Sequence, residues 1–268
     1  MRKQYFTPEI IADIRDNLHA DYVRTGWVPG WLHFETIRWH REDSGMDLIC
    51  GSGLHAMIIL PGPPKGEYVE SDLVTNVREF FARYTKRDPG CIRYAEAANE
   101  ADLPVNRFAG VQAYAAYYHD VAPVVASFGV PIITSGVSGE NRDWTSELAN
   151  LLYASKTPVS GYGFHPYGVE PARMAEATLA MRRAAGALAD GNFPVVYVTE
   201  IGESNARALY DTIVNLSHVT PTITIYEYQA QGREDPRYGL KNNPALYAAV
   251  QRAWATLHAQ PANSSTQQ

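Results

Sequence analysis

Two glutamates stand out in the sequence because each follows a short apolar run that is typical of a buried strand. Glu100 ends the segment CIRYAEAANE at 91–100, and Glu200 follows FPVVYVT at 193–199. If both strands belong to one parallel sheet, their carboxyl ends bring the two carboxylates to the same edge. Such a pair suits glycosidic bond cleavage, in which one acid protonates the leaving oxygen and the other carboxylate attacks the sugar carbon. Taken alone, either glutamate is equally compatible with a solvated residue just past a strand.

The elements that would position this pair alternate along the chain. Strand-like apolar runs occur at 20–27, 55–60, 91–98, 130–134, 159–164, 194–199 and 222–228. Apolar residues at helical spacing predict helices at 8–19, 34–51, 71–85, 106–128, 145–155, 171–189, 204–218 and 244–258. Strands that alternate with helices imply parallel strands joined by right-handed crossovers.

The sequence therefore predicts an α/β fold, a TIM-type (β/α)8 barrel whose first strand is missing or degenerate. Seven strands are expected, and only the short basic segment Met1–Phe6 could supply an eighth. A gap in the wall exposes two strand edges, which a loop or a second copy of the chain could cover, so a homodimer is one expectation. An open doubly wound sheet is the alternative, but the only candidate glycine loop, GSG at 51–53, precedes a strand instead of following one.

We expect residues 1–259 to form a single catalytic barrel and the polar residues 260–268 to be a disordered tail. Active sites of such barrels lie where the strands end. These ends read RTGW at 24–27, PGPP at 61–64, NE at 99–100, SGVS at 135–138, HPY at 165–167, EIG at 200–202 and EYQ at 227–229. Arg, Trp, Asn, Glu, His and Tyr accumulate there, which predicts a polar and aromatic binding site at one rim.

Four segments resemble motifs of the clan A glycoside hydrolases, the 4/7 superfamily, and of families 39 and 5 in particular. RYAEAANEAD at 93–102 resembles the strand-four acid/base signature, and VYVTEIG at 196–202 resembles the strand-seven nucleophile motif. GYGFHPYG at 161–168 resembles the strand-six His-x-Tyr motif, and IYEYQAQGREDPRYGL at 225–240 resembles a strand-eight segment. Arg24 is similar to the strand-two arginine of family 5. The order of the motifs also fits, and they cover nearly the whole chain.

The resemblance implies catalytic roles without a cofactor or a metal. Glu100 would be the general acid and then the base, and Glu200 the nucleophile. Arg24 and the hydroxyl of Tyr167 would keep Glu200 ionised. Glu96 would be a buried partner for an arginine inside the barrel. Arg24 could instead form a plain ion pair at the end of a strand.

Further residues would contact the sugar. Asn99 would donate to the 2-hydroxyl of the sugar, or else cap the following turn. His165 would hydrogen-bond near the acid, or else be a satisfied core histidine. Aromatic rings stack on the apolar faces of sugars, and the candidates are Trp27, Tyr226 and Tyr228.

Three residues depart from the family pattern. Ala98, Ala101 and Ile225 stand where the family has tryptophan, proline and tryptophan. These departures concern the placement of the substrate more than the chemistry. They keep open the alternative of a carbohydrate-binding barrel with weakened or lost turnover. A barrel enzyme that abstracts a proton is a third hypothesis, but such an enzyme would normally carry a glycine-rich phosphate site after its last strands.

Composition limits the remaining classes. The net charge of −6 argues against a nucleic-acid partner, and no apolar run approaches the length of a membrane span. The eight histidines form no HExxH motif, and no cysteine pair has zinc-site spacing. The first ten residues lack the apolar segment of a signal peptide, so we expect a cytoplasmic protein, or a secreted one whose signal has been removed. Cys50 and Cys91 both lie near strand starts and could be neighbours, but two buried free thiols are expected.

Overall fold

The computed structural model describes residues 6–26, 39–62, 70–106, 108–186, 192–229 and 236–259. Several features singled out in the sequence lie outside these ranges. They are residues 1–5 of the candidate first strand, Trp27, and the predicted tail at 260–268.

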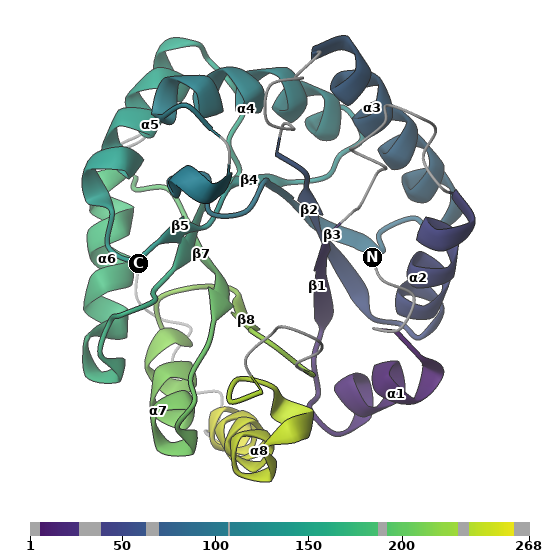
Figure 1. The fold of residues 1–268 in the computed structure, drawn as a ribbon, viewed down its shortest axis with the longest axis vertical. Coiled ribbons are helices and arrows are strands. Elements are labelled where there is room, and N and C mark those ends of the chain that lie inside the picture. The colour runs from purple at the N-terminus through teal and green to yellow at the C-terminus, as the bar shows by residue number, and fades with distance from the viewer. Residues whose placement is uncertain are drawn as a thin grey trace.

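Parallel strands form a ring that is surrounded by helices, so the predicted TIM-type α/β barrel is confirmed (Figure 1). The strands are β1 (Tyr22–Gly26), β2 (His55–Leu60), β3 (Ile92–Ala97), β4 (Ile132–Thr134), β5 (Val137–Ser138), β6 (Tyr162–His165), β7 (Val196–Ile201) and β8 (Ile223–Ile225). They pair in the orders β1-β2-β3-β4 and β5-β6-β7-β8. An isolated parallel bridge between Ile133 and Gly161 joins the two halves.

The eight labelled strands correspond to the seven predicted runs, because β4 and β5 are one passage of the chain. Only Ser135 and Gly136 separate them. Among the described residues, no strand pairs with the outer edge of β1 or of β8. Within the described residues, strand pairing is therefore interrupted between β1 and β8, and residues 1–5 of the candidate first strand lie outside these residues.

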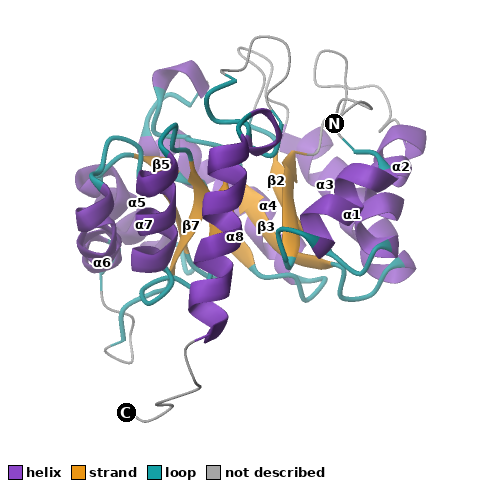
Figure 2. Ribbon diagram, turned by 90° about the horizontal axis from the view of Figure 1, so that it is seen from below, coloured by secondary structure: helices purple, strands orange, loops and turns teal. Residues whose placement is uncertain are grey.

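Helices cover the outside of the ring, as the side view in Figure 2 shows. They are α1 (Pro8–Asp16), α2 (Trp39–Gly51), α3 (Glu70–Arg87), α4 (Val111–Ala126), α5 (Arg142–Ala154), α6 (Met174–Ala184), α7 (Ala206–Leu216) and α8 (Pro244–Ala259). Short 3-10 helices lie at Pro104–Asn106, Pro171–Arg173 and Leu240–Asn242. In the described part of the chain, no helix has the length and apolar character needed to cross a membrane.

Local signals explain where two of the helices begin. α1 starts as predicted, with Thr7 accepting a hydrogen bond from the backbone N–H of Ile10 and with proline in the first turn. The helix predicted from residue 106 begins only at Val111, because Gly110 has a φ of +95° that interrupts helical geometry. The predicted boundary was therefore five residues early.

Tyrosine side chains fill the inside of the barrel. Met57, Ile133 and Tyr197 form a small buried cluster with Tyr22 and Tyr94 packed against it, separate from the larger core that includes the alternate residues of the same strands. The hydroxyl of Tyr22 lies 2.9 Å from Oγ1 of Thr224. Since Tyr22 belongs to β1 and Thr224 to β8, this side-chain contact joins two strands between which the described residues form no strand pairing.

On the outside of the barrel at the same place, hydrogen bonds join α1 to α8 and to the segment before it. α1 and α8 lie next to each other in Figure 1. Asp13 of α1 accepts hydrogen bonds from the hydroxyls of Tyr228 and Tyr247 and from Nδ2 of Asn17. Burial tends to raise the pKa of Asp13, but these hydrogen bonds outweigh it and lower the pKa to about 2. The ionised carboxylate therefore stabilises the seam between the first and last helices.

We expect Asp13→Asn to lower the free energy of unfolding by about 2 kcal/mol at pH 6, because the tyrosine hydroxyls lose a charged acceptor. The native pKa of about 2 lies below the unfolded value of about 3.9. The carboxylate's contribution is thus complete above about pH 4 and is lost as the pH falls through about 2. Urea unfolding at pH 6 and pH 2.5 would measure the shrinking difference. Asp16→Asn, on the exposed side of the same helix, is the matched control and should change little.

Cys50 and Cys91 form a disulfide, so the prediction of two free thiols is wrong. The register explains the proximity: Cys91 O accepts from Ala56 N at the start of β2, and Cys50 lies one short loop earlier at the end of α2. Their Cα atoms are 5.6 Å apart, within the usual range for a disulfide. The bond ties α2 to the start of β3, the strand that leads to Glu100.

Cross-linking residues 41 positions apart restricts the unfolded chain, which corresponds to a stabilisation of about 4 kcal/mol in the loop-entropy treatment. We expect the double variant Cys50→Ser/Cys91→Ser to lose about 2–4 kcal/mol in urea unfolding. Dithiothreitol should destabilise the wild type by the same amount and leave the double variant unchanged. An equal response of both proteins to the reductant would contradict the assignment.

Candidate active site

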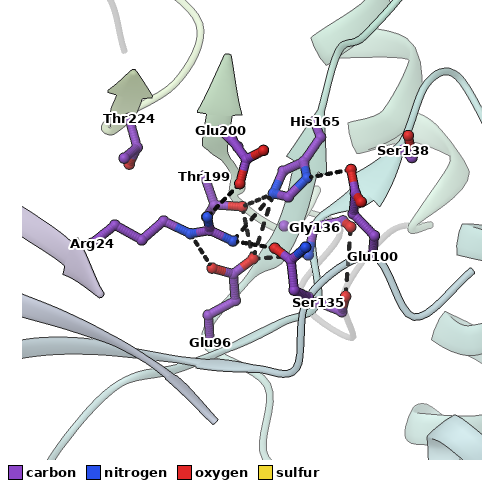
Figure 3. A network of polar contacts seen from close by, with 12 residues as sticks. Arg24, Glu96, Glu100, Ser135, Gly136, Ser138, His165, Thr199, Glu200 and Thr224 are labelled. Carbon is purple, nitrogen blue, oxygen red and sulfur yellow. Dashed lines mark hydrogen bonds and ion pairs between the residues drawn. The ribbon is translucent and has the colours of Figure 1, made fainter. Parts of the chain in front are cut away.

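A buried arginine holds the predicted rim residues together (Figure 3). Arg24 of β1 donates from Nε to Oε2 of Glu96 at 2.6 Å and from Nη1 to Oε2 of Glu200 at 2.5 Å. Its Nη2 donates to Oδ1 of Asn99 at 2.6 Å. Only 7% of the Arg24 side chain is exposed. One guanidinium therefore connects the ends of β1, β3 and β7, which lie far apart in the sequence.

Glu96 is the fully buried partner of this arginine, as predicted. Its Oε1 accepts hydrogen bonds from the backbone N–H of Gly136 at 3.0 Å and from the hydroxyl of Thr199 at 2.9 Å. Burial by itself raises the pKa of Glu96, but the charge of Arg24, its hydrogen bond and the nearby His165 outweigh burial and hold the pKa at about 2. Glu96 thus remains charged and balances Arg24.

His165 links this network to Glu100. Its Nδ1 lies 3.1 Å from Oε1 of Glu100, and its Nε2 lies 3.1 Å from Oγ1 of Thr199. Because Thr199 gives its hydroxyl proton to Glu96, its oxygen has to accept from Nε2–H of the imidazole. Nδ1 of His165 and the carboxyl of Glu100 are then left to share one proton between them.

Opposing effects act on the pKa of His165. Burial lowers the pKa of His165, but the hydrogen bond with Glu100 and the nearby carboxylate of Glu96 outweigh this effect, and the net pKa is raised above its ordinary value. His165 is fully buried and contacts acidic groups on both ring nitrogens. His165 thus hydrogen-bonds Glu100 and is also a buried histidine with a partner at each ring nitrogen, so the contacts fit both predicted alternatives.

Glu200 accepts a hydrogen bond on each carboxylate oxygen. Arg24 donates to Oε2, and the hydroxyl of Tyr167 donates to Oε1 at 2.6 Å. Burial, and then the neighbouring charge of Glu200, raise the pKa of Tyr167, so its hydroxyl keeps its proton and stays a donor. Both oxygens of Glu200 are thus acceptors and are fixed in direction by their donors. These are the two partners that the sequence motifs indicate.

The two glutamates approach each other across the rim. One oxygen of Glu100, one oxygen of Glu200 and a ring nitrogen of His165 all lie within 4.8 Å of one another. The side chains of Glu100 and Glu200 are 17% and 12% exposed, so both carboxylates remain accessible from the rim.

The same three residues are close enough to hold a metal ion. However, a divalent cation bound by Glu200 would share that carboxylate with the guanidinium of Arg24, and repulsion between the two positive charges opposes this. The raised pKa of His165 also disfavours the neutral imidazole that a metal requires. These three residues therefore fit a divalent metal ion poorly.

The backbone that carries Asn99 and Glu100 is strained. Ala98 has a φ of +67° and Glu100 a φ of +45°, both in the left-handed region. Non-glycine residues in this region cost on the order of 1–3 kcal/mol each and cluster at functional sites. Hydrogen bonds from Leu103 N and from Nδ2 of Asn106 to the carbonyl oxygen of Glu100 help to hold this conformation.

The predicted aromatic residues are placed differently from one another. Tyr226 follows β8 at the rim, where its backbone N–H donates to Ile201 O. The hydroxyl of Tyr228 donates instead to Asp13 of α1, so this ring belongs to the seam between the helices. Trp27 lies outside the described residues.

Sequence reasoning missed Thr199 and Gly136, although both stand directly at strand ends. Thr199 precedes Glu200 in the motif VYVTEIG, and Gly136 lies in the rim segment SGVS. Their position beside the motif residues is the feature of the sequence that could have identified them. Their hydrogen bonds to Glu96 depend on contacts across the barrel, which the sequence does not display.

Comparisons with known proteins agree with this fold. No protein-family model matches the chain, and no curated protein sequence matches it. Among solved structures, a GH39 β-xylosidase from Caulobacter crescentus has 15% identity and a TM-score of 0.77 over 95% of this chain and 68% of its own. A GH39 enzyme from Xanthomonas axonopodis pv. citri has 15% identity and a TM-score of 0.77 over 95% of this chain and 63% of its own.

A GH5-4 broad-specificity endoglucanase from an uncultured bacterium has 12% identity and a TM-score of 0.63 over 92% of this chain and 84% of its own. The resemblance to families 39 and 5 that the motifs indicate is therefore confirmed at the level of the fold. The chain spans only about two thirds of the length of the two family 39 structures.

Gly136 allows the close approach of His165. A Cβ atom on Gly136 would lie 2.1 Å from Nε2 of His165, far inside contact distance. We expect Gly136→Ala to displace the imidazole, to lower the free energy of unfolding by about 1–3 kcal/mol, and to return the pKa of His165 towards its ordinary value in an NMR titration. Gly51→Ala is the control, because an added Cβ there meets no atom within 4 Å. An unchanged His165 titration in Gly136→Ala would contradict the geometry.

Proposed function

We propose that the chain is a retaining glycoside hydrolase that cleaves β-glycosidic bonds, with Glu100 as acid/base and Glu200 as nucleophile. The observation that carries the proposal is the distance between their carboxylate oxygens, within 4.8 Å. Retaining enzymes hold these groups about 5–5.5 Å apart, whereas inverting enzymes separate them by about 6.5–9.5 Å to admit a water. The spacing supports direct attack by one carboxylate on the sugar.

The surroundings of Glu200 support its role as the nucleophile. Arg24 and Tyr167 donate hydrogen bonds to its two oxygens and hold the carboxylate in place, and a carboxylate is the group that attacks the sugar carbon. When the glycosyl–enzyme ester forms, the charge on Glu200 is lost. Arg24 then remains paired with the buried Glu96, so the site retains a partner for its cation throughout the cycle.

The contact with His165 supports the role of Glu100 as the proton donor. In the first step Glu100 gives its proton to the leaving oxygen, and in the second step it takes a proton from the attacking water. Nδ1 of His165 shares that proton with Glu100, so it can return the proton to the carboxyl as the leaving oxygen takes it up. Arg24 donates to Oδ1 of Asn99, so the amide NH₂ is the group of Asn99 that can donate to the 2-hydroxyl of the sugar.

The alternative is a carbohydrate-binding barrel that has lost turnover, which the departures at Ala98 and Ile225 keep open. Binding alone would not require an acid and a nucleophile at a catalytic separation, each with its own hydrogen-bond partners. We therefore favour the enzyme. β-Linked oligo- or polysaccharides are the proposed substrates, in line with the β-xylosidase and endoglucanase that share the fold. The Cys50–Cys91 disulfide favours a secreted protein.

Aryl β-xylosides and β-glucosides test the proposal. We expect Glu200→Gln to lower kcat by at least about 10³-fold, because the covalent step is lost. Glu100→Gln should lower kcat/KM by about 10²–10⁴-fold for phenyl leaving groups and much less for 2,4-dinitrophenyl, which leaves without protonation. Glu203→Gln, on the same loop after β7, is the matched control and should stay near wild-type activity.

Azide separates the nucleophile from a merely structural residue. Added to Glu200→Gly, azide should restore cleavage and yield the glycosyl azide of inverted configuration, since it enters the space of the missing carboxylate. Equal activity of the wild type, Glu100→Gln and Glu200→Gln would show that the assignment is wrong. An inactive wild type that still binds β-linked sugars in calorimetry would favour the binding barrel.

A further inference from the structure

Tyr114 of α4 reaches the strands next to the proposed acid from outside the barrel. Its hydroxyl donates to the carbonyl oxygen of Ala97 at 2.8 Å and accepts from the backbone N–H of Ser135 at 2.6 Å. The side chain is fully buried. Burial raises the pKa of the Tyr114 hydroxyl well above its ordinary value, so it keeps the proton that it donates.

The hydroxyl stands in place of a backbone hydrogen bond between β3 and β4. In their parallel register Ala95 N donates to Pro131 O, and Ala97 lies opposite Thr134. Continuing that register by two residues would pair Ser135 N directly with Ala97 O. Tyr114 instead bonds to both groups, so the strands separate at this point while neither backbone group is left without a partner.

The separation has consequences on both strands. On the β4 side, Gly136 N turns to Oε1 of Glu96, and Oγ of Ser135 accepts from Ala101 N at 2.9 Å. On the β3 side, the left-handed residues Ala98 and Glu100 follow immediately. The segment 97–101 is thus hydrogen-bonded at its first residue to Tyr114 and at its last residue to Ser135. Ser135 is in turn hydrogen-bonded to Tyr114.

We propose that Tyr114 is a positioning residue for the proton transfer by Glu100. Strained backbone persists only where the surroundings determine it, and Tyr114 and Ser135 supply that constraint at the two ends of the segment. Without the hydroxyl, Ala98 and Glu100 can relax towards ordinary φ values and carry the carboxyl away from its direction towards the leaving oxygen. The inference rests on the proposed function for its catalytic consequence, but not for its structural one.

Tyr118 provides a matched control one turn along the same helix. It is also fully buried, and its hydroxyl also donates to backbone carbonyls, those of Ile132 and Pro158. These lie at the opposite end of β4 from Ser135. Tyr118→Phe and Tyr114→Phe each remove one buried hydroxyl, so similar decreases in Tm are expected, and only Tyr114→Phe should change the placement of Glu100.

The kinetic test compares leaving groups. We expect Tyr114→Phe to lower kcat/KM about tenfold for phenyl β-glycosides and less than about twofold for 2,4-dinitrophenyl β-glycosides, because only the former need protonation. Ser135→Ala should give the same pattern, and the double variant should be no worse than the more impaired single one, since both changes break one connection. Tyr118→Phe should stay within about twofold of the wild type on both substrates.

Amide hydrogen exchange tests the constraint independently of activity. Exchange at Ala101 should accelerate in Tyr114→Phe and in Ser135→Ala but not in Tyr118→Phe. Unchanged exchange at Ala101 in Tyr114→Phe overturns the inference, and so does a leaving-group pattern equal to that of Tyr118→Phe in an active enzyme. A wild type inactive on every β-glycoside overturns the proposed function, and the exchange measurement then decides on the constraint alone.

Discussion

A buried positive charge is the constraint on which the rim of this barrel depends. The guanidinium of Arg24 is almost removed from water, and it is tolerated because Glu96 and Glu200 both accept its hydrogen bonds. Breaking such a buried pair by removing one partner typically costs about 3–5 kcal/mol, because the other charge is left uncompensated. Arg24 therefore fixes β1 relative to β3 and β7 and orients the proposed nucleophile at the same time. The same side chain thus contributes to the stability of the barrel and to the proposed chemistry.

In the described part of the barrel wall, side chains join β1 and β8, which are not paired as strands. Inside, Tyr22 of β1 reaches Thr224 of β8. Outside, Asp13 of α1 accepts hydrogen bonds from the hydroxyls of Tyr228 and Tyr247. Between β1 and β8, side-chain hydrogen bonds thus take the place of the backbone hydrogen bonds that join the other neighbouring strands. The Cys50–Cys91 disulfide adds a covalent tie near the start of β2 and β3.

The approach of the two proposed catalytic carboxylates depends on a departure from ideal sheet geometry. Where β3 and β4 would continue to pair, the hydroxyl of Tyr114 lies between them, and the following residues adopt left-handed conformations. An ideal strand would send alternate side chains to opposite faces and continue along the wall. The separated strands instead free Gly136 N for Glu96 and direct Glu100 to His165. The strained backbone at the rim is stabilised by the hydrogen bonds of Tyr114, which lies on α4 outside the sheet.

The sequence by itself determined the elements and the rim. Apolar periodicity is a local property, so the seven strand passages, most helices and the glutamates at the ends of β3 and β7 could be read from it. Only the tertiary structure decided which groups meet. The pairing of Cys50 with Cys91, the attachment of Tyr228 to Asp13 and the position of Tyr114 between two strands join residues that are separated in the chain. These contacts form because of strand register and the reach of side chains across the barrel. Neither property appears in a local pattern of residue types.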